Sequence, residues 1–336
     1  MAKISVLGCG FGTALAVMAN GCGHQVTLWS LFPQELEQIR RDGEQKRLLP
    51  GVAVPEEIAL TGDLACLTDC DLCIMAVPSS AVRETARRAA PFLREGTIVA
   101  NVAKGLEDGS FKRLSQVLEE ELPRQRIVVL SGPSHAEEVG RGQPATIAVA
   151  SADREAAQQV QELLMNPTLR LYVNDDVTGV ELGGALKNVI ALAAGIADGL
   201  SLGDSAKAAL MTRGIREIAR LGVHMGAKAE TFAGLSGIGD LIVTCTSMHS
   251  RNRRAGILIG QGMPAKDAVE KIGTVEGYPC AKTAYALSRK LGVEMPITEQ
   301  AYAVLYQEKS PAQALRDLMT RPKRHESENI WLEGEE

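Results

Sequence analysis

The side chain best placed for chemistry is Lys187, in the stretch VTGVELGGALKNVIALAAGIADG from Val177 to Gly199. Alanine and leucine recur there and no proline interrupts, so the stretch is predicted to form one helix. On a 3.6-residue period, Lys187, Asn188 and Asp198 share a narrow face with small residues, and apolar side chains cover the remaining surface. Such a helix is expected to be buried, and a buried lysine costs free energy unless it is paired or used.

Two explanations of Lys187 remain open from the residues alone. Its ammonium group could reach solvent or pair with a structural acid, and it would then have no part in catalysis. It could instead be a catalytic lysine, because burial disfavours the charged form and lowers the pKa of a lysine toward neutral pH. We favour the second explanation.

Polar clusters downstream could serve this helix. The segment SGIGDL places Asp240 beside two glycines, and SRNRR brings Ser250, Arg251 and Asn252 together. The planar fork of arginine donors fits a phosphate, and serine and asparagine add neutral donors beside it. An anion site is therefore predicted there, and the alternative is a charged helix start in water.

A further turn with glycine at both ends, Gly273-Thr274-Val275-Glu276-Gly277, carries one acid. Glu276 could cap the next helix or contact a cofactor, and the sequence does not distinguish these roles.

A phosphate-binding turn is predicted at the start of the chain. The apolar strand Ile4–Leu7 runs into Gly8, Gly10 and Gly12, and the alanine-rich segment Thr13–Ala19 follows as a helix. Glycines let the backbone approach a pyrophosphate, and the new helix offers free N–H groups to the negative charge. The spacing is G-x-G-x-G, one residue short of the usual G-x-G-x-x-G. A tight structural turn is the alternative.

The next strand, Gln25–Trp29, should end near the residue that contacts the adenosine ribose. The four residues Trp29 to Phe32 include neither the acid that binds a free 2′-hydroxyl nor an arginine that holds a 2′-phosphate. We therefore predict no large preference between NAD and NADP. Lys46 and Arg47 follow in the next loop and could approach the same place.

Alternating strands and helices continue to residue 174. Ser134 follows the strand Ile127–Leu130 and could donate to a phosphate or cap the helix that begins near Ala136. The pattern predicts an α/β, Rossmann-like dinucleotide-binding domain over residues 1–174 and an all-α domain over residues 175–336. The other predicted elements are strands at Leu72–Val77, Thr97–Val102, Ala145–Ala150 and Leu169–Val173, and a helix at Ala152–Leu164.

Composition favours a soluble cytoplasmic enzyme. The chain has 336 residues, 45% of them apolar and 23% charged, and its net charge of −5 argues against a nucleic-acid binder. We expect no apolar run to approach the roughly 20 residues needed to span a membrane, and the start MAKISVLG is unlike a signal peptide. The seven cysteines suit reduced thiols. Cys66, Cys70 and Cys73 have an iron–sulfur-like spacing, but Cys73 lies within a predicted strand, so no metal site is expected.

Five motifs make the chain resemble the bacterial NAD(P)-dependent glycerol-3-phosphate dehydrogenase family over roughly residues 3 to 320. The resemblance implies an N-terminal dinucleotide domain and a helical domain. It also implies reversible hydride transfer between NAD(P)H and dihydroxyacetone phosphate, a small phosphorylated three-carbon substrate, giving sn-glycerol 3-phosphate for glycerophospholipid synthesis. The motifs are AKGLE at Ala103, SGPSHAEEV at Ser131, ELGGALKNVIALAAG at Glu181, SGIGDLIVTC at Ser236 and SRNRR at Ser250.

The resemblance also implies roles for single residues. Lys187 would be the proton acceptor. The residues agree with this role, because Lys104 would be a nearby second cation and Asp240 would orient Lys187 or a substrate hydroxyl. Two turns on the cofactor side are each one residue shorter than in the family, and Leu31 stands where the family often has a basic residue or histidine. The substrate would contact Lys104, Gly132, Ser134, Lys187, Asp240, Ser250, Arg251 and Asn252. The cofactor would contact Gly8, Gly10, Phe11, Gly12, Lys104, Ala136, Arg251, Val275 and Glu276.

Two other functions compete with this one. A β-hydroxyacid dehydrogenase would also join a dinucleotide domain to a helical domain, although the GIGD and SRNRR clusters argue against it. A protein that senses NAD(H) without turnover is suggested by the two shortened turns, and Lys187 and Asp240 argue against it. The sequence leaves the oligomeric state open, a homodimer included.

Overall fold

The computed structural model describes residues 1–323 and 326, and it divides the chain into two compact units. The N-terminal unit consists of Met1–Lys104 and Lys112–Val177, and the C-terminal unit of Gly105–Phe111 and Thr178–Glu336. The change from strands to helices falls where it was predicted, since the last strand ends at Asn174 and a long helix begins at Val177. The functional division into a cofactor domain and a substrate domain at residue 174 stays a prediction.

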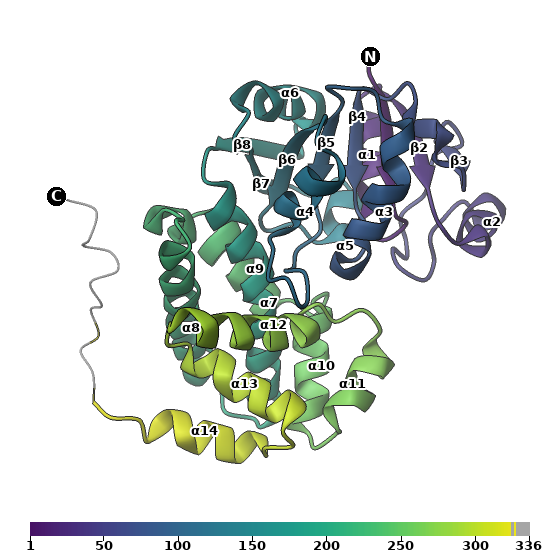
Figure 1. Cartoon of the computed structure of the whole chain (residues 1–336). Coiled ribbons are helices and arrows are strands. Elements are labelled where there is room, and N and C mark those ends of the chain that lie inside the picture. The colour runs from purple at the N-terminus through teal and green to yellow at the C-terminus, as the bar shows by residue number, and fades with distance from the viewer. Residues whose placement is uncertain (324–325, 327–336) are drawn as a thin grey trace. The chain divides into compact units, whose positions relative to one another are not determined.

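The N-terminal unit is built on one eight-stranded sheet with the strand order β3-β2-β1-β4-β5-β6-β7-β8 (Figure 1). Neighbouring strands are parallel except β6 and β7, which pair antiparallel, so the sheet is mixed. β3 is short and was not predicted. The strands are β1 Lys3–Leu7, β2 Gln25–Trp29, β3 Ala59–Thr61, β4 Leu72–Met75, β5 Ile98–Asn101, β6 Arg126–Ser131, β7 Ala145–Ala150 and β8 Leu169–Asn174.

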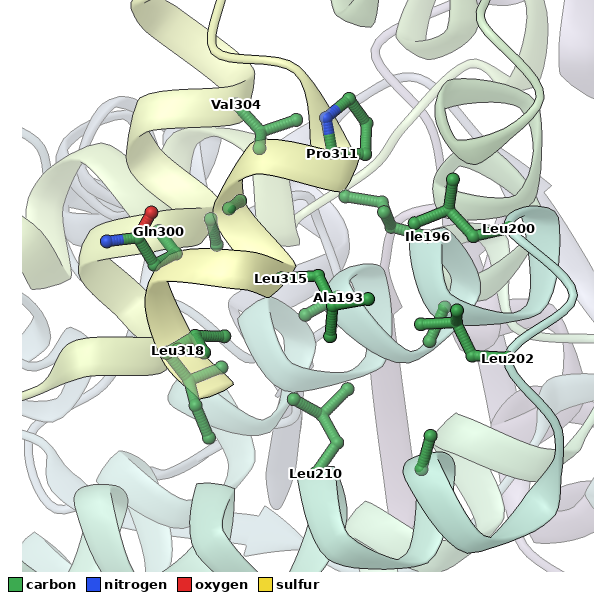
Figure 2. A pocket seen from close by; sticks show the side chains of 15 residues that line it. Ala193, Ile196, Leu200, Leu202, Leu210, Gln300, Val304, Pro311, Leu315 and Leu318 are labelled. Carbon is green, nitrogen blue, oxygen red and sulfur yellow. The ribbon is translucent and has the colours of Figure 1, made fainter. Parts of the chain in front are cut away.

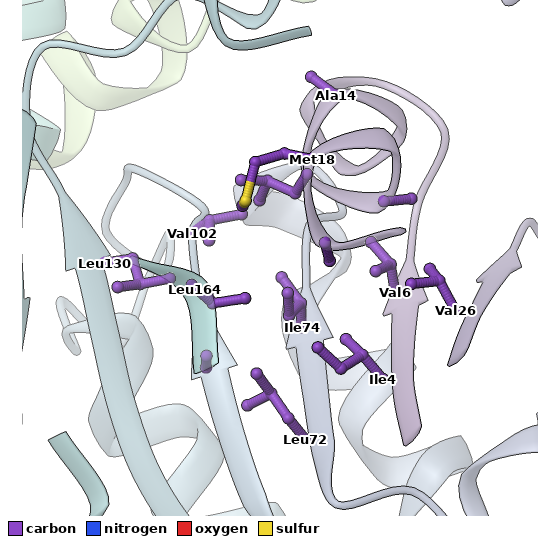
Figure 3. Packing of buried hydrophobic residues seen from close by; sticks show 14 of the residues in the cluster. Ile4, Val6, Ala14, Met18, Val26, Leu72, Ile74, Val102, Leu130 and Leu164 are labelled. Carbon is purple, nitrogen blue, oxygen red and sulfur yellow. The ribbon is translucent and has the colours of Figure 1, made fainter. Parts of the chain in front are cut away.

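Helices cover both faces of this sheet, because its side chains alternate between two apolar clusters. Ile74 on β4 packs with Ile4, Val6 and Met18 on one side, as Figure 3 shows, and Met75 packs with α3 and α4 on the other. This is the predicted Rossmann-like arrangement. The helices are α1 Phe11–Gly21, α2 Pro33–Asp42, α3 Val82–Ala89, α4 Leu114–Glu121, α5 Ala136–Gly140 and α6 Arg154–Leu164.

The C-terminal unit is helical in its described residues and is organised around the predicted helix, α7, which spans Val177–Gly199 (Figure 1). The other helices are α8 Asp204–His224, α9 Asp240–Thr246, α10 Arg251–Gly260, α11 Ala265–Ile272, α12 Gly277–Leu291, α13 Pro296–Tyr306 and α14 Pro311–Met319. Two short turns precede α9, a 3₁₀ turn at Ala229–Ala233 and a π turn at Leu235–Gly239.

By length and composition, α7 is the one helix among residues 1–323 that could cross a membrane, so the expectation of no such run was wrong. It has 23 residues, and 94% of its most apolar window is buried within the protein. Burial by its own helical neighbours accounts for this composition, as it does for the core helix of many globular proteins.

Glycine contacts bring α7 and α10 close together. A Cβ atom at Gly195 would lie 2.1 Å from the carbonyl oxygen of Arg253, and one at Gly256 would lie 2.1 Å from that of Leu192. No side chain fits such gaps, so only glycine permits this approach of two helix backbones. Gly195 thus admits the backbone of α10 to this face of α7.

A buried acid fixes the start of α13. The carboxylate of Glu217 on α8 accepts hydrogen bonds from the backbone N–H groups of Ile297, at 2.7 Å, and Thr298, at 3.2 Å. These N–H groups have no partner within their own helix, so Glu217 acts as a remote cap. Burial raises the pKa of Glu217 to about 7, against the lowering effect of the two hydrogen bonds.

We predict that Glu217 lowers stability as the pH rises from about 4.5 to about 7. Its pKa is about 7 in the folded protein and 4.5 for an ordinary glutamate, so the folded state binds more protons in this window. The free energy of unfolding should therefore fall with pH, by up to about 3 kcal/mol from this group. Glu217→Gln should remove that component. Urea unfolding of both proteins at pH 5 and pH 8 measures it, and equal pH dependence would contradict the prediction.

Candidate active site

The glycine turn of the N-terminal unit has the form that a dinucleotide requires. Gly8 has φ of +116°, and a Cβ atom there would lie 2.6 Å from the carbonyl oxygen of Ala76. At Gly12, a Cβ atom would lie 3.0 Å from side-chain atoms of both Val6 and Ala76. These two glycines therefore serve the tight turn and the packing of α1 onto the sheet.

Gly10, the middle glycine of the turn, leaves open space at the N-terminus of α1. Nothing in the described protein lies within 4 Å of the Cβ position at Gly10, and its backbone, with φ of −86° and ψ of −111°, lies outside the regions that other residues favour. The space beside it is open, at the N-terminus of α1, where backbone N–H groups can meet a pyrophosphate. The shortened G-x-G-x-G turn thus fits the cofactor, and Phe11 is the first residue of the helix that follows.

Two charged groups lie near the end of β2: Arg47, which the sequence left able to approach this place, and Glu35, which was not foreseen. Glu35, in the first turn of α2, accepts a hydrogen bond from the Ser30 hydroxyl at 2.8 Å. Arg47 forms an ion pair with the other oxygen of Glu35 at 2.6 Å. Neither residue is in the tetrapeptide after β2. The path of α2 and of the loop after it brings Glu35 to Ser30 and Arg47 to Glu35.

Three predicted substrate residues meet at one carbonyl group of the N-terminal unit. Lys104 donates to the carbonyl oxygen of Gly132 at 2.9 Å, and the Ser134 hydroxyl donates to the same oxygen at 3.1 Å. Gly132 has φ of +149°, and a Cβ atom there would lie 2.9 Å from the Cα atom of Ile147. The helix cap proposed for Ser134 is wrong, because His135 stands at the N-cap position of α5. Ala136 is the first residue of that helix.

Lys187 and Asp240 form a buried ion pair in the C-terminal unit. The Lys187 ammonium lies 2.5 Å from Asp240 Oδ1 and 2.6 Å from the Thr244 hydroxyl oxygen. The Lys187 and Asp240 side chains are 7% and 1% exposed, so the pair is shielded from water. Asp240 favours the ammonium form of Lys187, which opposes the effect of burial that the sequence suggested.

Glycines beside α7 place Asp240 against Lys187. A Cβ atom at Gly183 would lie 2.4 Å from the carbonyl oxygen of Ser236, so only glycine lets the π turn rest on α7. A Cβ atom at Gly237 would lie 2.0 Å from the carbonyl oxygen of Phe232. The glycines of the GIGD motif therefore allow close packing, and its last residue, Asp240, is the first residue of α9.

The SRNRR cluster forms the start of α10. Ser250 is its N-cap and accepts a hydrogen bond from the backbone N–H of Arg253 at 3.2 Å, which leaves the Ser250 hydroxyl proton available as a donor. Arg251 is the first residue of the helix and is exposed. Of the two explanations for this segment, a capped helix start is present, and the anion site stays a prediction.

Asn252 ties this cluster to α7 and α12. Its amide donates to Asn188 Oδ1 at 3.0 Å, and its oxygen accepts from the backbone N–H of Gly277 at 2.8 Å. Asn252 therefore positions the turn before α12, in which Val275 is buried and Glu276 takes the N-cap position without a side-chain cap bond. The cap proposed for the Glu276 side chain is thus wrong, and its cofactor contact stays a prediction.

A second ion-pair network holds the same helix start. Asp198, at the end of α7, pairs with Arg253 at 2.7 Å and with Lys207 of α8 at 2.6 Å. Arg253 also donates to the carbonyl oxygen of Thr246, the last residue of α9, at 2.6 Å. The C-terminal end of α9 and the N-terminal end of α10 are thereby fixed to α7.

The cysteines offer no metal centre in the described part of the chain. All seven are free thiols, and residues 1–323 with 326 contain no group of three metal-ligating side chains. Burial raises the pKa of Cys70 to about 11 and that of Cys73 well above its ordinary value, so the thiols of that spacing stay protonated.

The C-terminal unit also contains an apolar cavity of about 100 Å³, shown in Figure 2. Residues of α7, α8, α13 and α14 line it, and Gln300 is its single polar lining side chain. None of the predicted site residues borders it, so it lies apart from Lys187 and offers no group for proton transfer.

These features define a class of protein, the nicotinamide-dependent dehydrogenases that join a Rossmann-like sheet to a helical domain. Family comparison is more specific. The model described as NAD-dependent glycerol-3-phosphate dehydrogenase N-terminus matches residues 3–157, and the one described as its C-terminus matches residues 176–316. The chain therefore belongs to the NAD-dependent glycerol-3-phosphate dehydrogenase family, a family of NAD(P)-dependent oxidoreductases, and the resemblance seen in its motifs is confirmed.

Individual relatives agree over their whole length. The glycerol-3-phosphate dehydrogenase [NAD(P)+] of Desulfitobacterium hafniense is 54% identical, with 99% of this chain and 95% of that protein covered. The protein of the same name from Moorella thermoacetica is 56% identical, with 97% and 98% covered. The crystal structure of glycerol-3-phosphate dehydrogenase from Coxiella burnetii is 39% identical with a TM-score of 0.92, covering 95% of this chain and 99% of that one.

Sequence reasoning missed Thr244 as a site residue. Its signal was present, because Thr244 follows Asp240 by four residues and so lies on the same face of α9. Asn188 was noted on the polar face of α7 but not named as a site residue, and its amide pairs with Asn252.

We predict that Thr244→Val lowers kcat by about tenfold and leaves the Kd of the cofactor unchanged. Valine keeps the shape but removes the oxygen that accepts from Lys187, and a hydrogen bond to a charged group contributes about 1.5–3 kcal/mol. The matched control is Thr246→Val, on the same helix, whose hydroxyl is exposed and bonds only the carbonyl oxygen of Ile242. Steady-state measurement of kcat for both variants tests this. An equal effect of the two substitutions would show that Thr244 has no specific role in the site.

Proposed function

We propose that this chain catalyses the reversible transfer of a hydride between NAD(P)H and C2 of dihydroxyacetone phosphate, giving sn-glycerol 3-phosphate. The observation that carries the proposal is the buried pair of Lys187 and Asp240, 2.5 Å apart, within a helical unit that matches the family model. Relatives at 54% and 56% identity carry the name of this activity, and they support the proposal over nearly the full length of the chain.

Lys187 is the proposed proton-transfer group. The nicotinamide, when bound, supplies the hydride. In reduction, the Lys187 ammonium donates a proton to the oxygen on C2 as the carbonyl carbon receives the hydride, and in oxidation the neutral amine takes that proton back. Asp240 and Thr244 hold the nitrogen in place and stabilise its charged form, so the net reaction consumes one proton per ketone reduced.

Charged and neutral donors are proposed to contact the substrate. In the C-terminal unit, the guanidinium of Arg251 is exposed and the Ser250 hydroxyl proton is available. In the N-terminal unit, Lys104 and Ser134 converge on the Gly132 carbonyl, and both are proposed substrate contacts. Arg251 and Lys104, together with Phe11, Ala136, Val275 and Glu276, are also proposed to contact the cofactor.

The two competing functions have less support. Solved structures of D-mandelate dehydrogenase share the fold with a TM-score of 0.62, but at 15% identity this likeness shows the fold alone. A protein that only senses NAD(H) has no use for a buried lysine paired with an acid, which is costly to bury.

The setting of the enzyme is likewise a proposal. We infer that it acts in the cytoplasm and that its product serves glycerophospholipid synthesis, and a homodimer, which the sequence left open, is the third point. The family membership and the small substrate support the first two, and cross-linking or sedimentation at micromolar concentration would test the third.

Replacing Lys187 with methionine should lower kcat by about 10² to 10⁴ and leave cofactor binding nearly intact, because a positioned proton donor contributes that range. The change preserves volume but leaves Asp240 buried without its partner, so Lys187→Met combined with Asp240→Asn is a necessary companion. Lys309→Met is the control, since Lys309 pairs with Asp317 in the same unit but borders no site residue. Turnover above about half of the wild-type value would show that Lys187 is structural.

Replacing Arg251 with alanine should cost about 1.5–3 kcal/mol in kcat/KM for dihydroxyacetone phosphate, roughly ten- to a hundredfold, because a charge-assisted contact is lost. Dihydroxyacetone lacks the phosphate and should be a poor substrate that the substitution barely worsens. Since Arg251 could also touch the cofactor, the difference between the two losses is the quantity to measure. Equal losses for both substrates would leave SRNRR as an exposed helix start.

A further inference from the structure

Glu35 is held in a defined position at the end of β2. The Ser30 hydroxyl donates to Glu35 Oε2 at 2.8 Å and accepts from the backbone N–H of Phe32 at 3.1 Å. The Glu35 side chain is 15% exposed, so its carboxylate is mostly withdrawn from water. An acid with this much support is not a freely moving surface group.

Arg47 is held far less tightly. Its guanidinium donates to Glu35 Oε1 at 2.6 Å, but its side chain is 69% exposed and lies in the segment between α2 and β3. The neighbouring Lys46 points to a different acid, Asp42, at 3.3 Å. The pair therefore consists of a fixed negative charge and a positive charge that can move into solvent.

This pair adjoins the glycine turn. The backbone N–H of Gly8 donates to the carbonyl oxygen of Trp29 at 2.9 Å, which ties the turn to the last residue of β2. Ser30 follows Trp29 directly, and burial, together with the charge of Glu35, raises the pKa of Cys9, the residue between Gly8 and Gly10, to about 12. Glu35 thus lies beside the turn that receives the pyrophosphate, on the side of β2, where dinucleotide folds place the adenosine ribose.

We propose that Glu35 and Arg47 decide between the two nicotinamide cofactors, with Glu35 favouring NADH and Arg47 allowing NADPH. The inference rests on cofactor binding at the glycine turn. Each carboxylate oxygen of Glu35 has one protein donor and can accept another, so a ribose 2′-hydroxyl can donate to it. A 2′-phosphate brings negative charge next to Glu35 and is repelled, unless Arg47 leaves Glu35 and pairs with the phosphate.

The expected preference is moderate for this reason. Arg47 can pair with a 2′-phosphate only if it breaks its ion pair with Glu35. The fixed Glu35 carboxylate then faces the phosphate without its counter-ion. The wild type should bind NADH about tenfold more tightly than NADPH, equal to about 1.4 kcal/mol. A tenfold ratio agrees with the prediction from the sequence that neither cofactor is strongly preferred.

The test is a titration of the whole purified protein with NADH and with NADPH, following nicotinamide fluorescence without substrate. Glu35→Gln removes the charge and frees Arg47, so it should tighten NADPH binding and shift the affinity ratio toward NADPH by at least tenfold. Arg47→Ala should weaken NADPH by about tenfold and NADH by less than threefold. The controls are Glu37→Gln, an exposed acid on the same helix, and Lys46→Ala, and both should leave the ratio within twofold.

The outcomes separate this inference from the proposed function. A wild type that binds neither cofactor would overturn both. Binding of both cofactors with a ratio that Glu35→Gln and Arg47→Ala leave within twofold of the wild type would overturn the inference alone. If Glu35→Gln melts well below the wild type, the Arg47→Ala titration carries the decision by itself, because that side chain is exposed and its removal leaves the Ser30–Glu35 contact in place.

Discussion

The close approach of neighbouring backbones to α7 is the constraint on which the C-terminal unit depends. At Gly183 and Gly195, a Cβ atom would lie 2.4 Å and 2.1 Å from carbonyl oxygens of the π turn and of α10. Any larger residue would push these segments outward. Asp240 follows directly after that turn, so the 2.5 Å separation from Lys187 could not then be kept. The glycines therefore set the geometry for proton transfer, although none of them takes part in it.

The ion pair that these contacts enclose is better explained by chemistry than by stability. Replacing a buried ion pair with apolar side chains is often neutral or stabilising, because two charges must be removed from water. On α7, the residues next to Lys187 or one turn away are mostly apolar or small, with Asn188 as the exception, so apolar side chains could fill the same volume. Retention of a lysine, an acid and Thr244 in such a core fits a function that requires a charged nitrogen at a fixed place.

The sequence predicted the fold well where the pattern was local. The bounds of β2, β7 and α7 match the predicted ranges, because apolar periodicity and flanking polar residues mark them directly. The antiparallel pairing of β7 depends on the path of the chain through space, and no local pattern carries that information. In the site, Asp240 was found from its motif. Its partner Thr244 and the network through Asp198 were not, since each depends on which helices pack together.

The cofactor side shows why distance along the chain was a poor guide there. The residue that contacts the adenosine ribose was expected directly after β2, at Trp29 to Phe32, where the sequence has no charged residue. α2 begins at Pro33, and its first turn places Glu35 within hydrogen-bonding distance of the Ser30 hydroxyl. A shortened glycine turn still supplies its three backbone roles at Gly8, Gly10 and Gly12. Selection between cofactors can therefore lie in the following helix and loop, which the turn itself does not constrain.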